Sequence, residues 1–410
     1  MTATAPRLHR PGVQRALIAA VQVLALAVWF SVSAVVPSLQ QDWGISTGTA
    51  VWLTGTVQLG FVTGAVASTA WNLPERVPGP VLMGCSALAA GACTVVIALA
   101  VSTVPSALAL RFLTGMALAG VYPVGMKLTA SWAPRRGRGL AMGLMIGALT
   151  LGSSLPHLVG GLVTWPWREV LVVTAALAVL GGGVALTAIR TGPHVAAGPV
   201  RLDPRYAVTM FREKGPRRVN LGYFGHMWEL YALWTWLPFF VAAAAGSGGD
   251  APTSGDRLTV FVTMGCCGLL GCLVGGWAAD RFGRAPAAVG ALGISGVCCL
   301  LSPLAFGAPP IVLALFCGLW GAAVIADSGV FSTALSEAAD QRYVGTALTA
   351  QTAIGFALTV VSIQLVPLLA DAVSWRWAFW LLVPGPVVGV IAMARAHVPL
   401  RGGGAASPAG

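Results

Sequence analysis

Long stretches without a charged side chain repeat along the whole chain, and they limit its fold more than any other feature. The first covers residues 16–41 and the last covers residues 377–394. Only 9% of the 410 residues are charged, whereas soluble domains have about 25%. Because a helix needs about 20 apolar residues to cross the hydrocarbon core of a bilayer, the sequence predicts an all-α integral membrane protein.

About twelve transmembrane helices are expected once two long stretches are divided at turn-forming residues. One division falls at Ser102–Pro105 and the other at Gly307–Pro310. The remaining stretches are residues 43–74, 139–165, 170–189, 219–245, 258–279 and 344–370, besides the first and the last, and 219–245 contains one charged residue, Glu229. The predicted protein therefore consists of membrane-spanning helices joined by short loops.

The basic residues predict the orientation of these helices. With the N-terminus placed inside, 19 of the 24 lysines and arginines fall in inner segments, as the positive-inside rule requires. We therefore expect a multi-pass protein of the inner (cytoplasmic) membrane, with both termini in the cytoplasm. The net charge of +11 does not indicate nucleic-acid binding, because the charges form short clusters between apolar runs and no basic face.

One long polar segment, residues 190–218, divides the predicted helices six and six. This predicts a first bundle in residues 1–189, a basic cytoplasmic linker in 190–218, and a second bundle with a short tail in 219–410. Shifting the second half by about 205 residues places Asp280-Arg281 on Glu75-Arg76 and Ala232-Leu233-Trp234 on Ala27-Val28-Trp29. Two bundles in parallel orientation are typical of a class of secondary transporters.

The segment Gly276-Trp-Ala-Ala-Asp280-Arg281-Phe-Gly283-Arg284 resembles the loop signature G-x-x-x-D-R-x-G-R of the major facilitator superfamily. The resemblance implies two six-helix bundles that rock about a central substrate site, and a conformational role for this loop. The equivalent loop of the first half retains only Glu75 and Arg76. The residues themselves predict a tight turn at Gly283, with Asp280 paired to Arg281, to Arg284 or to a neighbouring helix end.

Two further patterns are similar to elements of this family. Arg111-Phe-Leu-Thr-Gly115 is similar to an R-x-x-x-G element tied to proton coupling. In the fifth predicted helix, four glycines fit the spacing of an antiporter pattern, but Pro156-His157 stands where the pattern has Gly-Pro. The glycines are Gly143, Gly152, Gly160 and Gly161. The patterns favour antiport or export over uptake.

Ionisable residues inside a bilayer are costly, and each is therefore a candidate for the transport pathway. Glu229 lies about 15 Å beyond Arg218 at a rise of 1.5 Å per residue, which is near the bilayer centre. His226 lies on the same helix face and Trp236 follows on it. We expect Glu229 to bind protons or substrate, although a structural hydrogen-bond role is an open alternative.

The other pathway candidates are less specific. Asp327 shares a helix face with Trp320, and Arg111 shares one with Tyr122, but a helix-to-helix anchor or a side chain extended to the interface would explain each charge as well. The same alternative holds for Lys127, and His157 could be either a proton relay or a satisfied donor. The first helix contributes Gln22 and Trp29, since the family resemblance places that helix against the cavity.

Together these observations predict a secondary active transporter of a small organic solute, coupled to protons and acting by alternating access. An uptake permease for a small anion is the main alternative, because Arg111 and Lys127 suit an anion. A transition-metal importer that uses His226, Met227 and the cysteines is a weaker one, since no ligand spacing repeats across helices. We expect no enzymatic activity, no cofactor and no bound metal, and a monomer whose partners are membrane lipid, substrate and protons.

Overall fold

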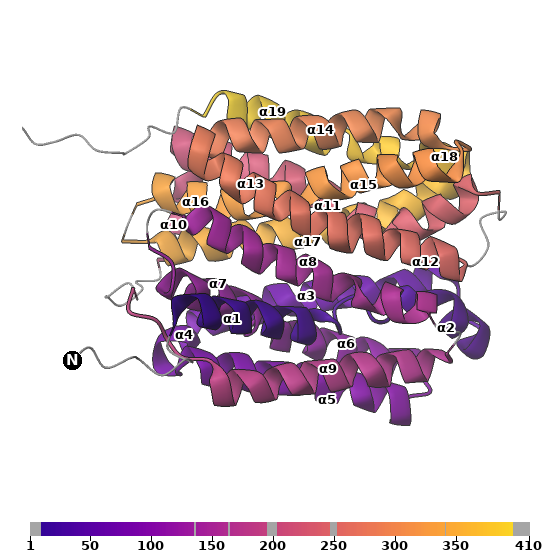
Figure 1. Ribbon diagram of the computed structural model, residues 1–410, viewed down its shortest axis with the longest axis horizontal. Helices are drawn as coiled ribbons and strands as arrows, with labels where there is room; N and C mark the ends of the chain where they lie inside the picture. Colours follow the sequence, from indigo (N-terminus) through magenta and orange to yellow (C-terminus); the bar gives the residue numbers. More distant parts are fainter. Residues whose placement is uncertain are drawn as a thin grey trace, which may run out of the picture.

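The computed structural model describes residues 10–134, 137–162, 165–194, 203–246, 252–340 and 342–396, and these residues contain helices and no strand. The long helices run side by side in two bundles (Figure 1). The first half of the chain forms the bundle drawn from indigo to magenta, and the second half forms the one drawn from pink to yellow. The predicted all-α architecture of two bundles is confirmed.

The first bundle contains α1 to α9. Their bounds are α1 Pro11–Leu26, α2 Val36–Trp43, α3 Thr47–Ala70, α4 Leu73–Arg76, α5 Gly79–Ala100, α6 Val104–Leu118, α7 Tyr122–Ser131, α8 Arg138–Leu162 and α9 Trp167–Ala188, with a 3-10 turn η2 at Ser33–Val35.

Two short helices, α10 and η3, lie in the predicted linker, and the second bundle follows them. The bounds are α10 Tyr206–Thr209, η3 Met210–Arg212, α11 Lys214–Ala244, α12 Ser254–Val260, the π-helical η4 Phe261–Cys267, α13 Gly268–Phe282, α14 Arg284–Ala305, α15 Pro310–Ala326, α16 Ser328–Ala338, α17 Val344–Val373, α18 Trp375–Ala378, η5 Phe379–Leu382 and α19 Pro384–Ala394.

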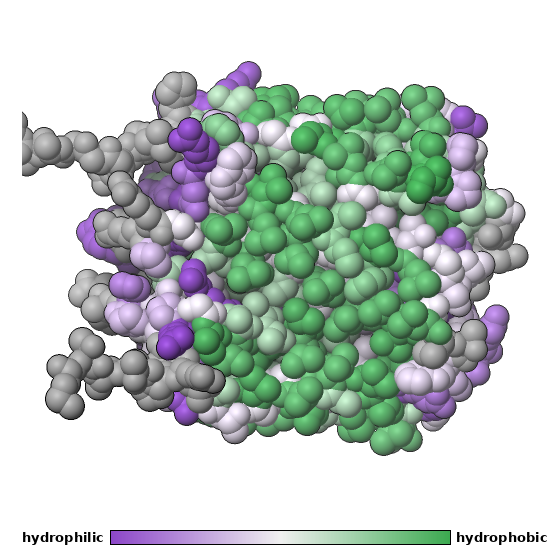
Figure 2. Space-filling view, viewed as in Figure 1, coloured by the Kyte–Doolittle hydropathy of each residue, from purple (hydrophilic) through white to green (hydrophobic). Residues whose placement is uncertain are grey.

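In the described part of the chain, ten helices are long and apolar enough to cross a membrane. Two further spans stand at the start of the two halves. The first half begins with the interrupted span made of α1 and α2, and the second half begins with the 31-residue α11. On the face shown in Figure 2, an apolar band covers the middle of the molecule, between hydrophilic ends. The end that carries α4, α10 and α16 is called the linker end below, and the end that carries α2 and α12 is called the far end.

Several of the described spans are interrupted near their middle. The first is broken between Leu26 and Ser33, the fourth between Leu118 and Tyr122, and the tenth at Asp327. Backbone groups freed by such breaks must find partners inside the protein, because lipid offers none. Interrupted spans are therefore positions where side chains are recruited to hold the backbone.

The two bundles contact each other mainly through α8 with α13 and α3 with α17. The first contact is a backbone contact: a Cβ atom added to Gly143 would lie 2.4 Å from the carbonyl oxygen of Cys272, and one added to Gly276 would lie 2.5 Å from that of Gly139. Only glycine fits such an approach. At the linker end, the hydroxyl oxygens of Thr69 and Thr349 are 3.0 Å apart across the second contact.

Candidate functional site

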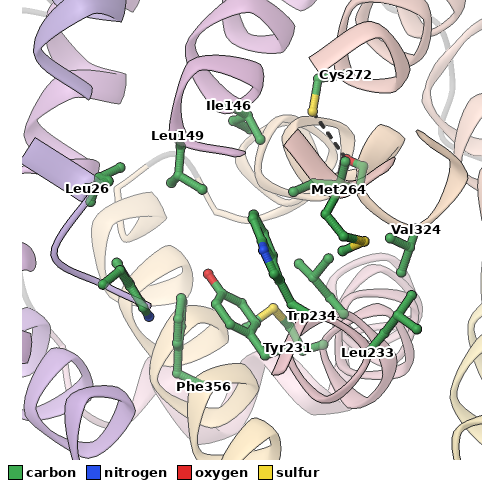
Figure 3. Close-up of a cluster of buried hydrophobic side chains, with 14 of the residues drawn as sticks. Leu26, Ile146, Leu149, Tyr231, Leu233, Trp234, Met264, Cys272, Val324 and Phe356 are labelled. Atoms are coloured by element: carbon green, nitrogen blue, oxygen red, sulfur yellow. Dashed lines mark hydrogen bonds between the residues drawn. The ribbon is translucent and has the colours of Figure 1, made fainter. Parts of the chain in front are cut away.

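Aromatic side chains from both bundles meet between the two halves of the molecule. The first bundle supplies Trp29, Phe30 and Phe61, and the second supplies Tyr231, Trp234 and Phe356; these six rings are called the central cluster. The Phe61 and Phe356 ring centroids are 4.5 Å apart, and the stacked Phe30 and Trp234 centroids are 5.2 Å apart. Tyr231, Trp234 and Phe356 point toward Leu26 and Leu149 of the first bundle (Figure 3).

The break in the first span places two of these rings. Trp29 and Phe30 follow the end of α1 at Leu26, before the chain resumes a helical path at Ser33. Trp29 lies 5.0 Å from Phe61 and 6.0 Å from Tyr231, measured between ring centroids. Trp29 is 1% exposed, so solvent does not reach this ring of the central cluster in the structure.

Polar atoms in or next to the central cluster lack partners. The indole nitrogens of Trp29 and Trp234 and both amide atoms of Gln58, which is one turn before Phe61 on α3, are buried without a hydrogen-bond partner among the described residues. A buried polar group without a partner costs about 1–3 kcal/mol. The cluster therefore offers an apolar surface together with donors and acceptors that a bound solute could satisfy.

Arg111 holds the broken first span in place. Its guanidinium donates to the carbonyl oxygens of Val28 at 3.0 Å, Trp29 at 2.5 Å and Leu53 at 3.2 Å, and it is fully buried. The first two carbonyls belong to the break. Among the residues that the structure describes, no carboxylate forms an ion pair with Arg111. The side chain thus fixes Trp29 beside the cluster and leaves a buried positive charge without an acidic partner.

Glu229 lies inside the second bundle, at the junction of α11, α14 and α15. Its Oε1 accepts hydrogen bonds from the Ser295 hydroxyl at 2.5 Å, Trp320 Nε1 at 2.7 Å and the Cys299 thiol at 3.2 Å. The side chain is 1% exposed, and no cation in the described ranges forms an ion pair with it. A carboxylate in this setting has donors that stabilise its charge, and it can also bind a proton.

His226 and Asp327 form a second buried polar pair one turn away. His226 Nδ1 lies 2.9 Å from Asp327 Oδ1, and its Nε2 lies 2.8 Å from the Ser328 hydroxyl. Asp327 interrupts the tenth span between α15 and α16. The sequence predicted that His226 shares a helix face with Glu229 and that Trp320 shares one with Asp327. In the structure the partners are exchanged: His226 pairs with Asp327, and Trp320 donates a hydrogen bond to Glu229.

The remaining pathway candidates lie apart from these groups, with the exception of Tyr122, whose ring is 6.2 Å from Phe61. Gln22 donates to the Val121 carbonyl at 3.1 Å within the first bundle, and Trp236 donates to the Ile363 carbonyl at 2.8 Å within the second. Lys127 extends to the linker end, where its ammonium group lies 2.6 Å from the Glu75 carboxylate. The structure does not bring these three side chains to the central cluster.

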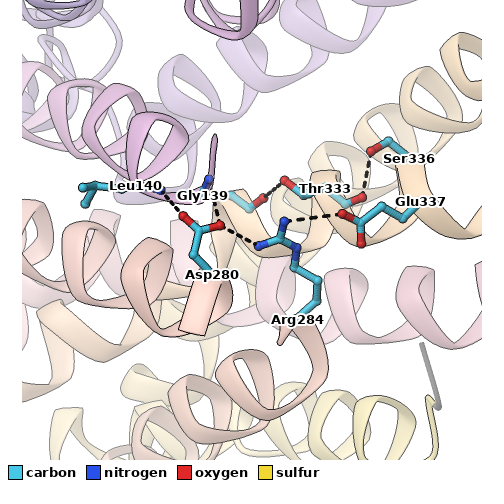
Figure 4. A network of polar contacts seen from close by, with 8 residues as sticks. Gly139, Leu140, Asp280, Arg284, Thr333, Ser336 and Glu337 are labelled. Atoms are coloured by element: carbon cyan, nitrogen blue, oxygen red, sulfur yellow. Dashed lines mark hydrogen bonds and ion pairs between the residues drawn. The ribbon is translucent and has the colours of Figure 1, made fainter. Parts of the chain in front are cut away.

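Asp280 of the loop motif connects the two bundles at the linker end (Figure 4). Its carboxylate accepts from the backbone nitrogens of Gly139 and Leu140 at 3.2 and 3.1 Å, in the first turn of α8. Arg284 lies 3.2 Å from Asp280 and 3.4 Å from Glu337. Free N–H groups at a helix start attract an anion, so the carboxylate, a helix end and Arg284 form a latch between the bundles.

The rest of the motif shapes the turn. Gly283 has φ 97°, a conformation that glycine adopts readily, and it ends α13 where α14 begins. Arg76 and Arg281 are exposed. The Glu75 carboxylate pairs with Lys127 of its own bundle, so the first-half loop does not repeat the contact of Asp280 across the interface.

The latch leads to a prediction for Asp280→Asn. The amide of asparagine carries no negative charge, so its hydrogen bonds with the two backbone N–H groups are weaker. A charge-assisted hydrogen bond is about twice as strong as a neutral one. We expect transport to fall about tenfold, which corresponds to about 1.4 kcal/mol, with expression unchanged. Glu75→Gln is the matched control, and uptake into proteoliposomes is the measurement. A larger loss in Glu75→Gln than in Asp280→Asn would contradict the assignment.

Several residues of the site carry no sequence signal that distinguishes them. Phe61 and Phe356 are single aromatic residues in apolar helices, and Gln58 and Ser295 are single polar ones. Their importance depends on which helices face each other. An alignment of the two halves on Trp29 and Trp234 was one available signal for the site, since both tryptophans belong to the central cluster.

Comparisons with known proteins agree with this architecture. The model of the Major Facilitator Superfamily matches residues 18–363. A bacterial homologue of the human lysosomal transporter Spinster, in an inward-facing and unoccupied conformation, has a TM-score of 0.68 at 14% identity, with 95% of this chain and 96% of that chain covered. The proton:xylose symporter XylE has a TM-score of 0.70 at 16% identity with the same coverage. These structures support the fold alone.

Three curated relatives are similar in sequence. A gentisate transporter of Corynebacterium glutamicum is 25% identical over 64% of this chain and 60% of its own length. A gallate transporter of Pseudomonas putida is 27% identical over 60% and 61%, and a chloramphenicol resistance protein of Streptomyces lividans is 28% identical over 62% and 63%. The match thus spans less than two thirds of the length of each relative.

Proposed function

Since the chain belongs to the major facilitator superfamily, we propose that it is a proton-coupled secondary transporter of a small solute that contains an aromatic ring. The central cluster is the observation that carries this proposal, because six rings from both bundles meet there and two of them, Trp29 and Trp234, have indole nitrogens without a partner among the described residues. Offset aromatic pairs contribute about 0.5–1.5 kcal/mol beyond their buried area. A planar ring could replace one of the cross-bundle contacts and add hydrogen bonds.

The relatives support the choice of substrate class. Gentisate and gallate are aromatic hydroxy acids, and chloramphenicol also contains a benzene ring. Their hydroxyl and amide groups match the free indole nitrogens of Trp29 and Trp234 and the free amide of Gln58. In this proposal the two bundles, residues 1–189 and 219–410, rock as units of a monomer, with 190–218 as linker.

Buried carboxylates support proton coupling. Glu229 has no basic partner among the described residues, and Asp327 pairs with the buried His226. Protonation of either carboxylate would therefore break no salt bridge at the surface. The partial glycine pattern on α8 favours antiport and export. The linker end is placed in the cytoplasm, with both termini, on the distribution of basic residues.

A second candidate, uptake of an aromatic anion, is favoured by one observation. The buried guanidinium of Arg111 has no acidic partner in the described ranges, and it donates a hydrogen bond to the carbonyl of Trp29. A fixed positive charge next to the ring site would attract a carboxylate. The direction of the proton gradient that drives transport distinguishes this candidate from export.

Uptake by proteoliposomes under pH gradients of both signs tests the proposal. We expect transport of 2,5-dihydroxybenzoate, 3,4,5-trihydroxybenzoate or chloramphenicol, and a loss of about 10- to 100-fold in Trp29→Ala, since truncating a buried aromatic anchor costs 2 kcal/mol or more. Trp277→Ala is the control, because Trp277 is 53% exposed on α13. Absence of transport of all three compounds, or equal activity of both variants, would refute the aromatic site.

A further inference from the structure

A small cavity lies between the bundles on the far-end side of the central cluster. In this structure it has room for about one water molecule, and it is lined by residues that include Ser33, His157, Pro238, Phe239, Pro252 and Arg257; it is called the far cavity. Ser33 follows Trp29 by four residues and Pro238 follows Trp234 by four. On α11 four residues correspond to about 6 Å of rise, so the far cavity adjoins the central cluster.

His157 gives this cavity an unused polar group. The side chain is 2% exposed, and neither ring nitrogen has a hydrogen-bond partner among the described residues. It lies on α8 in the half of that helix that faces α12. A buried imidazole without a partner costs free energy that a polar ligand would recover.

Arg257 adds a positive charge from the other bundle. Among the described residues, its one hydrogen bond is to the Gly160 carbonyl at 3.4 Å, and no carboxylate there forms an ion pair with it. The adjacent Asp256 is occupied, because its Oδ2 accepts from the backbone nitrogen and hydroxyl of Thr253 at 2.8 and 2.7 Å. The guanidinium therefore retains donors for a ligand.

Apart from Ser33, the rest of the lining is apolar. Phe239 stacks on Trp375 with ring centroids 5.9 Å apart, and prolines line the cavity beside it. A guanidinium and an imidazole beside a ring surface match an aromatic carboxylate, because arginine binds carboxylates through two parallel hydrogen bonds.

We propose that the far cavity is a second binding subsite, which holds the carboxylate of an aromatic acid between the far end and the central cluster. This inference rests on the proposed transport of aromatic solutes. Arg257 and His157 belong to opposite bundles, and the cavity between them widens when the bundles separate at this end, so a carboxylate reaches both groups from the far end. The subsite acts on substrate that enters or leaves at the far end and has no effect at the linker end.

Sided transport kinetics of the full-length protein test this inference. In uniformly oriented proteoliposomes, Arg257→Gln is expected to raise the KM for 2,5-dihydroxybenzoate supplied at the far end about tenfold, the effect of losing about 1.4 kcal/mol. The KM for the same compound supplied at the linker end stays at the wild-type value. Arg257→Lys restores part of the loss, and the neutral analogue 2,5-dihydroxybenzamide shows no effect.

Arg168→Gln is the matched control, because Arg168 donates to the Ala98 carbonyl at 2.8 Å at the same end without lining the cavity. If Arg257→Gln is not recovered from membranes, Gly160→Ala displaces the guanidinium instead, since its methyl group would lie 2.8 Å from Nη1. Equal KM changes at both ends, or none, would overturn the subsite alone. Failure of the wild type to transport the acid would overturn the proposed function, and this inference with it.

Discussion

Replacing Glu229 with glutamine is expected to abolish transport driven by a pH gradient, while exchange of substrate between equal concentrations continues. The glutamine oxygen can still accept from Ser295, Trp320 and Cys299, which all bond to the same carboxylate oxygen. The amide cannot bind or release a proton at any physiological pH. Shape and hydrogen bonding are therefore preserved, and only the titration is lost.

Two measurements on the same proteoliposomes separate the possible results for Glu229→Gln. Accumulation under an imposed pH gradient reports coupling, and equilibrium exchange of labelled substrate reports binding and rocking. Asp327→Asn is the matched variant, since Asp327 is also buried but has His226 as a partner at 2.9 Å. Retention of wild-type pH dependence by Glu229→Gln would remove this residue from coupling and leave Asp327 or His157 as the next candidate.

Loss of the Arg111 guanidinium is expected to damage both stability and transport. In Arg111→Met, the carbonyls of Val28, Trp29 and Leu53 lose their donor inside the protein. Hydrogen bonds to a charged group contribute about 1.5–3 kcal/mol each, so we expect a loss of several kcal/mol and a lower melting temperature. Trp29 would also lose its fixed position, and transport should fall below detection.

Two further variants show whether the Arg111 effect is specific. Arg111→Lys keeps the charge but cannot bond three divergent carbonyls, because lysine lacks the planar fork of arginine, and intermediate stability is expected. Arg168→Met removes an arginine that donates to a single carbonyl, Ala98, and a small shift is expected. A melting temperature of Arg111→Met equal to that of Arg168→Met would show that Arg111 does not support the first span.

The membrane fold could be predicted from the sequence because the bilayer imposes a single length scale on every span. Uncharged runs of about 20 residues mark helices regardless of how they pack, and the twelve predicted spans follow the helices of the structure. The turn at Gly283 was predictable for a similar reason, since the local sequence determines it. The break between Leu26 and Ser33 was not, because the apolar run continues through it.

The partners of the intramembrane charges depend on packing that no local pattern encodes. A regular helix through Gln22 and Trp29 would place both on one face, but the break turns Trp29 to the other bundle while Gln22 bonds to Val121. Lys127 lies near enough to the linker end for its long side chain to reach Glu75. Glu229 was recognised from its depth alone, whereas its donors come from α14 and α15, which the sequence could not place around it.

The two acid–arginine loops differ in one respect that bears on the resting state of the carrier. Asp280 joins the bundles, whereas Glu75 is bound to Lys127 within the first bundle. The balance between carriers closed and open at the linker end then depends strongly on one turn, and a change of about 1.4 kcal/mol there alters the ratio tenfold. A single substitution near Gly283 could therefore retune which side of the membrane the empty protein faces, and its apparent affinity on each side, without altering a residue that touches the solute.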